Sequence, residues 1–279
     1  MPPVGLVLLA VSSVQIGGAL AKTLFDDLGP GGTVFLRVLF AAIVLGAVWR
    51  PRVRGLGRRD LVLVGLFGLS LAGMNGCFYL ALDRLPLGVA VTFEFVGPLG
   101  VAIAGSRKAL DVLWVVLAAA GILLLAGPAG GDIDAAGVAL ALLAGAFWAA
   151  YIVASTRVGQ VFEGGSGLAL AMVVASVLLV GPGVADAGSE LLDPALLALG
   201  AAVAMLASAI PYSLELEALR RLPQRVFGVL MSLEPAVAAA AGFVVLGEVL
   251  DARELLAIGL VVAASAGATR TAEIVPRDG

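Results

Sequence analysis

The sequence predicts an all-α membrane protein of ten transmembrane helices, arranged as two inverted five-helix repeats. Composition, the spacing of apolar runs and an internal repeat carry this prediction. Of the 279 residues, 61% are hydrophobic and only 13% are charged, and the mean hydropathy is +1.09. A helix needs about 20 apolar residues to cross the hydrocarbon core of a bilayer. Ten crossings therefore use most of the chain and leave no room for a soluble domain.

Ten apolar runs, separated by short polar segments, are the predicted spans. Each is expected to be helical, because an open strand edge leaves backbone polar groups unsatisfied in lipid. Ala19-Leu20-Ala21 also resembles a signal-peptidase site, but no Lys or Arg precedes the first run, which favours an uncleaved span. The spans cover 4–24, 33–49, 61–82, 86–105, 112–128, 135–156, 165–183, 194–216, 224–247 and 254–270.

Basic residues are concentrated in alternate loops, and this asymmetry predicts the orientation. In one set of loops, the only basic residues are Arg84 and Arg253. By the positive-inside rule, the other set is cytoplasmic, together with both termini. The predicted location is a bacterial inner membrane. The basic set comprises Arg50, Arg52, Arg54, Arg58, Arg59, Arg107, Lys108, Arg157, Arg220, Arg221, Arg225, Arg270 and Arg277.

An internal repeat relates the fourth span to the ninth. Residues 81–86 (ALDRLP) match residues 218–223 (ALRRLP), and at the same offset 95–105 match 232–242. This predicts repeats at 1–130 and 131–279. Because five is odd, the second repeat enters the membrane from the opposite side. Secondary transporters have this architecture, with the substrate site near the midplane between the halves.

Glu94, in the middle of the fourth span, is the first candidate for chemistry. Burying its charge costs about 2.5–3.5 kcal/mol, and protonating it at neutral pH costs a similar free energy of about 3.7 kcal/mol. Glu94 can therefore be charged in a wet cavity and neutral in a dry one, as a proton-coupling carboxylate must be. The alternative is a structural carboxyl with a permanent hydrogen bond.

Prolines in equivalent positions of the two repeats predict broken helices at the midplane. Pro98 removes the hydrogen bond to the carbonyl of Glu94, and Pro235 removes the one to the aligned Met231. Glu234 adds a second carboxylate at similar depth. The alternatives are simple packing kinks and, for Glu234, a structural hydrogen bond to a neighbouring helix.

The eighth span carries a polar stretch with Ser208, Pro211, Tyr212 and Glu215, in which Pro211 frees the carbonyl of Ala207. Glu215 either lines a cavity or extends toward the cytoplasmic interface. The uncharged candidates for lining a cavity are Gln15, Asn75, Tyr79, Trp148 and Tyr151.

Lys22 and Arg37 lie just inside the outer ends of the first two predicted spans. They either attract a carboxylate in an outer vestibule or pair with Asp26 and Asp27.

Absent residue types exclude several classes of function. The sequence has no His and a single Cys, so a His-based triad, a His or Cys metal site and an intrachain disulfide are excluded. No metal, cofactor or nucleic acid is expected. A lipid-modifying membrane enzyme is the competing class, but such enzymes usually carry His, Asp or Cys clusters.

Small residues at 259, 263 and 267 predict close helix packing, with a homodimer as the alternative.

Several longer motifs are spread along nearly all of the chain, at residues 15–25, 73–79, 86–98, 211–215 and 227–235. They resemble the drug/metabolite transporter superfamily, in its EamA-type branch of ten-helix permeases. The resemblance implies alternating-access efflux of small polar amino acids such as threonine and homoserine, driven by the proton gradient. The nearest alternative is another cargo on the same fold, such as an aromatic amino acid, a nucleotide-sugar or a drug.

Overall fold

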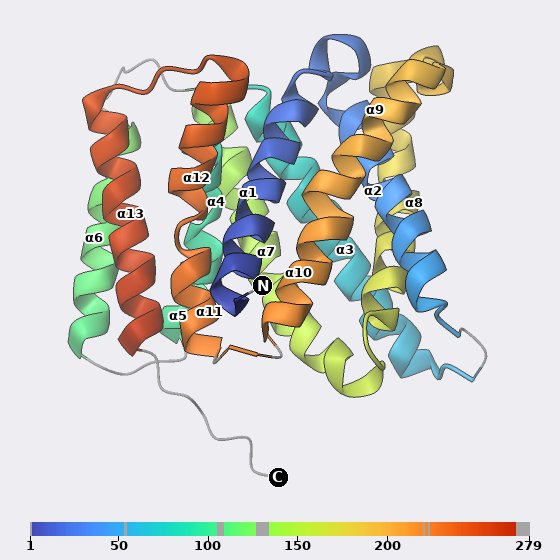
Figure 1. Ribbon diagram of the computed structural model, residues 1–279, viewed down its shortest axis with the longest axis horizontal. Helices are drawn as coiled ribbons and strands as arrows, with labels where there is room; N and C mark the ends of the chain where they lie inside the picture. Colours follow the sequence, from blue (N-terminus) through green and yellow to red (C-terminus); the bar gives the residue numbers. More distant parts are fainter. Residues whose placement is uncertain are drawn as a thin grey trace.

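The computed structural model describes residues 2–52, 55–104, 109–126, 134–219, 221–222 and 224–271. Every regular element in these ranges is helical, which confirms the all-α prediction (Figure 1). The elements are α1 (Pro3–Lys22), α2 (Phe25–Trp49), α3 (Arg58–Leu82), α4 (Leu87–Glu94), α5 (Val96–Ala104), α6 (Ala109–Ala126), α7 (Ala135–Val161), α8 (Ser166–Ala187), η1 (Gly188–Leu192), α9 (Pro194–Ala204), η2 (Met205–Ala209), α10 (Ile210–Leu219), α11 (Gln224–Met231), α12 (Glu234–Ala241), η3 (Gly242–Leu246) and α13 (Ala252–Thr271).

These elements make ten crossings, as predicted. Seven crossings are single helices, namely α1, α2, α3, α6, α7, α8 and α13, within the described ranges. The other three are composite: α4 with α5, α9 with η2 and α10, and α11 with α12 and η3. A separate criterion of length and hydropathy, which selects a different set from these single helices, finds 7 stretches of the described chain that are long and apolar enough to span a membrane. The bundle is therefore a multi-pass membrane protein.

The second crossing begins at Phe25, well before the predicted start at residue 33. The helix breaks at Gly29, which adopts a positive φ of 64°, and resumes beyond this kink. The backbone N–H of Gly31 donates to Asp186 Oδ2 of α8 at 2.8 Å. This bond satisfies a donor that the kink leaves free.

Helix packing follows a two-fold pattern. α2 packs on α8, α6 on α13 and α4 on α12, so that these three spans contact their repeat mates. The packing of α3 on α7 has its counterpart in that of α10 on α1. Two repeats related by a pseudo-two-fold axis produce such pairs. The predicted repeat boundary at 130–131 lies outside the described residues and stays a prediction.

Close backbone approaches hold the broken helices at the centre of the bundle. Gly97 of α5 lies directly against the backbone of Gly145 of α7. A Cβ atom at Gly145 would lie 2.5 Å from the carbonyl oxygen of Glu94. A Cβ atom at Gly88 of α4 would lie 2.8 Å from Ala239 of α12. Small residues permit such contacts between helices in lipid.

The last span uses its small residues unequally. Gly267 packs against the ring of Trp114 of α6, whereas Gly259 has open space beside it. Close packing therefore accounts for Gly267, and the homodimer stays a prediction.

The helices of the bundle end at two faces, which we call the terminal face and the opposite face. The terminal face carries the starts of α1 and α3 and the ends of α10 and α13, and the opposite face carries the end of α1 and the starts of α4, α7 and α13 (Figure 1). On the opposite face, Asp134 caps α7 by accepting from the backbone N–H groups of Ala136 and Gly137. Arg84, which hydrogen-bonds this carboxylate, and those two N–H groups hold the pKa of Asp134 below its usual value.

Candidate substrate cavity

A cavity of about 630 Å³ lies between the two halves of the bundle. Its lining begins near the middle of the helices and extends toward the terminal face, reaching Val101 of α5, Ser155 of α7 and Phe227 of α11. Crossings from both repeats contribute to it. The residues that line it are Val14, Gln15, Gly18, Arg37, Met74, Asn75, Phe78, Val91, Glu94, Phe95, Pro98, Val101, Trp148, Tyr151, Ile152, Ser155, Ala207, Tyr212, Glu215, Phe227, Met231, Glu234 and Ser265.

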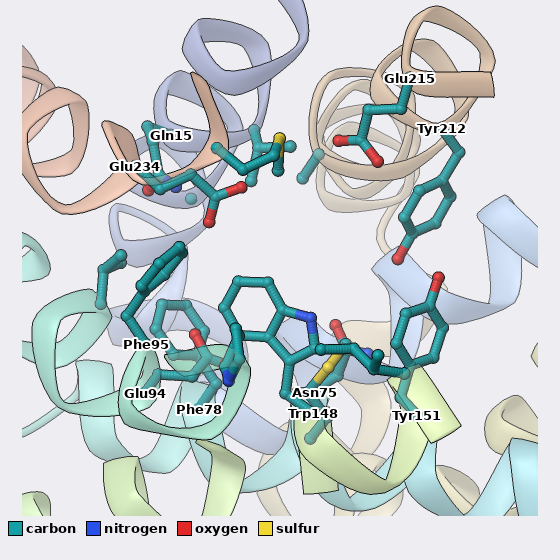
Figure 2. Close-up of a pocket in the computed structure, with 18 of the residues that line it drawn as sticks. Gln15, Asn75, Phe78, Glu94, Phe95, Trp148, Tyr151, Tyr212, Glu215 and Glu234 are labelled. Atoms are coloured by element: carbon teal, nitrogen blue, oxygen red, sulfur yellow. The ribbon is translucent and has the colours of Figure 1, made fainter. Parts of the chain in front are cut away.

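Three carboxylates line this cavity. Glu94 ends α4, Glu234 begins α12 and Glu215 lies on α10 (Figure 2). Glu94 is 8% exposed and Glu234 is 5% exposed. Within the described residues, none of the three side chains forms a hydrogen bond or an ion pair. Buried carboxylates without partners are costly, so the cavity favours a cationic ligand or protons.

The composite helices break at equivalent positions of the two repeats. α4 ends at Glu94 and α5 begins at Val96, shortly before Pro98. α11 ends at Met231 and α12 begins at Glu234, with Pro235 in its first turn. The breaks thus place one carboxylate at the C-terminal end of a half-helix and the other at an N-terminal end. The carbonyl of Glu94, which Pro98 leaves free, is covered by Gly145 of α7.

Arg37 of α2 is the cation in the cavity wall. Its Nε donates to Ser208 Oγ at 3.2 Å, its Nη1 to Tyr79 Oη at 3.3 Å, and its Nη2 to the Ala207 carbonyl at 3.0 Å. The guanidinium also lies over the Tyr79 ring, 5.4 Å from its centroid. Arg37 is 8% exposed and forms no ion pair in the described part of the chain. The structure therefore places Arg37 in the central cavity, bonded to neither Asp26 nor Asp27.

The backbone acceptor of Arg37 is available because of Pro211. Proline at 211 cannot donate to the carbonyls of the preceding turn, which in the structure is the π-helical η2. Arg37 occupies the freed carbonyl of Ala207, and Ser13 Oγ donates to the carbonyl of Leu206 at 2.6 Å. Side chains from α1 and α2 thus form hydrogen bonds with the free carbonyl groups of this irregular turn.

Lys22 lies away from the cavity, at the opposite face. Its Nζ forms an ion pair with Glu248 Oε1 at 2.8 Å and donates to the Leu85 carbonyl at 2.9 Å. Glu248 Oε2 accepts from the Leu87 N–H at 2.8 Å. We call this set the Lys22–Glu248 clasp. It joins the end of α1, the start of α4 and the segment after η3.

The uncharged candidates divide between the cavity surface and the layer behind it. Tyr79 and Ser208 are fully buried behind Arg37 and hold it in place. Trp148 contacts Phe95 edge to face, at 5.4 Å between ring centroids. Figure 2 shows the hydroxyls of Tyr151 and Tyr212 directed toward each other. The candidates that face the cavity are Gln15, Asn75, Trp148, Tyr151 and Tyr212.

Sequence reasoning missed two groups of residues. Met74, Phe78 and Phe227 line the cavity, but an apolar side chain in an apolar span gives no signal of its own. Glu248 was missed because its partner Lys22 is distant in sequence and only the fold brings the two together.

A helical bundle with paired broken helices around a central charged cavity is the architecture of a membrane transporter. The sequence profile of the EamA-like transporter family matches residues 135–270. The chain is 44% identical over 279 residues to the threonine/homoserine exporter RhtA of Salmonella typhimurium (strain LT2), covering 99% of this chain and 94% of that protein. It is 45% identical over 273 residues to RhtA of Escherichia coli (strain K12), covering 96% and 92%.

A solved crystal structure superimposes with a TM-score of 0.62, covering 99% of both chains at 21% identity, and so shares the fold. The chain belongs to the EamA-like transporter family. This confirms the resemblance drawn from the sequence motifs. It also makes the protein a transporter, in place of the membrane enzyme that was the competing class.

Proposed function

We propose that this protein exports small polar amino acids such as threonine and homoserine, in exchange for protons. The extensive identity to two threonine/homoserine exporters supports this cargo. The observation that carries the proposal is the pair of buried, unpartnered carboxylates, Glu94 and Glu234, in the central cavity. An α-ammonium group supplies the positive charge that these side chains lack in the protein.

The cavity volume suits a small cargo, since small-molecule sites usually measure about 300–1,000 Å³. Its wall combines acids with hydrogen-bonding groups such as Gln15 and Asn75, which suit the hydroxyl of threonine or homoserine.

Exchange requires that substrate and proton exclude each other. An ionised Glu94 attracts an ammonium group, whereas a protonated Glu94 does not. A proton that arrives at Glu94 therefore releases the amino acid, and the return of the emptied carrier delivers the proton. Glu234, which faces the same cavity, is the second candidate for this role.

The direction of transport follows from the orientation that the arginine-rich loops predict. With the terminal face in the cytoplasm, the cavity extends toward the cytoplasm and the Lys22–Glu248 clasp closes the other side. The structure then corresponds to the state in which an exporter loads its cargo.

A second candidate cargo is an aromatic amino acid. Phe78, Phe95, Trp148 and Tyr151 all line the cavity, and aromatic walls favour an aromatic side chain. The ammonium and carboxylate of such a cargo would use the same charged groups.

The test is counterflow in proteoliposomes that contain the purified protein. Vesicles loaded with unlabelled threonine should accumulate labelled threonine and homoserine, and protein-free vesicles should not. Phenylalanine and a nucleotide-sugar belong in the same panel. Accumulation of phenylalanine without threonine would transfer the proposal to the second cargo, and accumulation of the nucleotide-sugar alone would overturn both.

A further inference from the structure

The charge of Arg37 is buried and forms no ion pair in the described part of the chain, although Glu94 acts on it electrostatically from within the same cavity. Its three hydrogen bonds within the described residues all go to neutral groups: a serine hydroxyl, a tyrosine hydroxyl and a backbone carbonyl. A buried cation is stable only where an anion or several dipoles compensate it. Glu94, Glu215 and Glu234 line the same cavity, but none of them pairs with Arg37. The protein thus holds opposite charges apart across an open space.

Arg37 also retains donors for a ligand. A guanidinium has five N–H groups, and three of them are used in the described part of the chain. The remaining N–H groups and the cavity-facing position of Arg37 suit a planar anion such as a carboxylate, which accepts from both arms of the fork.

The guanidinium is also fixed in place before any ligand arrives. Tyr79 supports it through its ring and its hydroxyl, and the Ala207 carbonyl is available only because Pro211 interrupts the crossing. A pre-oriented fork loses less side-chain entropy on binding than a free one does. Tyr79 and Ser208 are therefore positioning residues for Arg37.

We propose that Arg37 binds the carboxylate of the transported amino acid, while the cavity glutamates bind its ammonium group. This assignment rests on the proposed function and adds the group that makes the site specific for zwitterions. An amine that lacks the carboxylate would bind only to the glutamates and not to Arg37.

The test compares threonine with threoninol, in which an alcohol replaces the carboxylate and the ammonium group is retained. Apparent Kd values come from ligand-dependent thermal stabilisation of the purified full-length protein. Wild type should bind threonine about 10- to 100-fold more tightly than threoninol, the range expected for hydrogen bonds between charged groups. Arg37→Gln should weaken threonine binding to the threoninol level and leave threoninol binding unchanged. Arg84→Gln, which removes an exposed arginine at the opposite face, should retain the wild-type ratio.

Arg37→Lys provides a second variant, which keeps the positive charge but lacks the paired N–H groups of the guanidinium. Its ratio of threoninol Kd to threonine Kd should fall between those of wild type and Arg37→Gln. A purely structural Arg37 would weaken both ligands equally in either variant, and that result would overturn the inference. If wild type binds both ligands equally well, the carboxylate is not recognised, and the inference fails while the transport of amines stands. If wild type binds neither ligand, the proposed amino-acid cargo itself fails.

Discussion

At the scale of single residues, the two buried cavity carboxylates, Glu94 and Glu234, differ in their helix environment. Glu234 begins α12, where the free N–H groups and the positive end of the helix dipole stabilise a negative charge. Glu94 ends α4, where the carbonyl groups and the negative end of the dipole oppose it. We therefore expect a cationic ligand to stabilise Glu94 more than Glu234, which makes Glu94 the first candidate for the ammonium site of the proposed exporter.

Glu94→Gln should fold and should lose proton-driven export. The amide has the shape of the carboxylate and is less costly to bury in a membrane protein, but it neither pairs with an ammonium group nor takes up a proton. Threonine efflux from proteoliposomes under an imposed pH gradient should fall by about tenfold or more. Glu190→Gln, at an exposed acid of η1, is the matched control. Wild-type efflux with an unchanged pH dependence would make Glu94 structural and move the coupling site to Glu234.

At the scale of elements, irregular backbone in three crossings builds the site. Lipid tolerates free backbone groups only where protein or a wet cavity satisfies them, and the two carbonyls of η2 that accept from Ser13 and Arg37 meet this condition. The prolines at 98, 211 and 235 could be identified as helix breakers from the sequence alone. Their exact effect could not, because a π-helical turn depends on side chains from other helices.

Pro211→Ala should make this crossing more regularly helical and weaken threonine binding. The new backbone N–H competes with Ser13 and Arg37 for the carbonyls of η2, so Arg37 loses an acceptor that fixes its guanidinium. The melting temperature should rise, since a helical hydrogen bond contributes about 1 kcal/mol. Threonine should bind several-fold more weakly. Pro182→Ala in α8, away from the cavity lining, should raise the melting temperature without affecting binding. Unchanged threonine affinity in Pro211→Ala would show that Arg37 does not depend on this carbonyl.

At the scale of the whole molecule, composition and repeats were sufficient to predict ten crossings, because the requirement for apolar spans is strict. Depth along a span was harder to predict. The predicted span starting at residue 33 placed Arg37 just inside its outer end. In the structure, α2 begins at Phe25 with a break at Gly29, and Arg37 is buried and lines the central cavity. The Lys22–Glu248 clasp could not be predicted at all, since it joins the two repeats through residues with no shared pattern.

The Lys22–Glu248 clasp should control access from the opposite face. Its ion pair is partly buried, with side chains 24% and 17% exposed, and it joins elements from both repeats. Alternating access requires such contacts to break when the cavity opens on that side. Lys22→Met should therefore shift the population toward the state open at the opposite face.

A single cysteine at Gln15, which lines the cavity, reports this shift when Cys77 is replaced by Ala. An impermeant thiol reagent applied to intact cells should label this cysteine faster in Lys22→Met than in its parent. Glu248→Gln should have the same effect, and Arg84→Gln, which breaks an exposed ion pair at the same face, should have none. Because both members of the clasp also bond the backbone around Pro86, the charge-reversed pair Lys22→Glu with Glu248→Lys should restore closure only in part. Equal labelling rates in all variants would mean that the opposite face is held shut by helix packing, as at Gly88 against Ala239, and not by the ion pair.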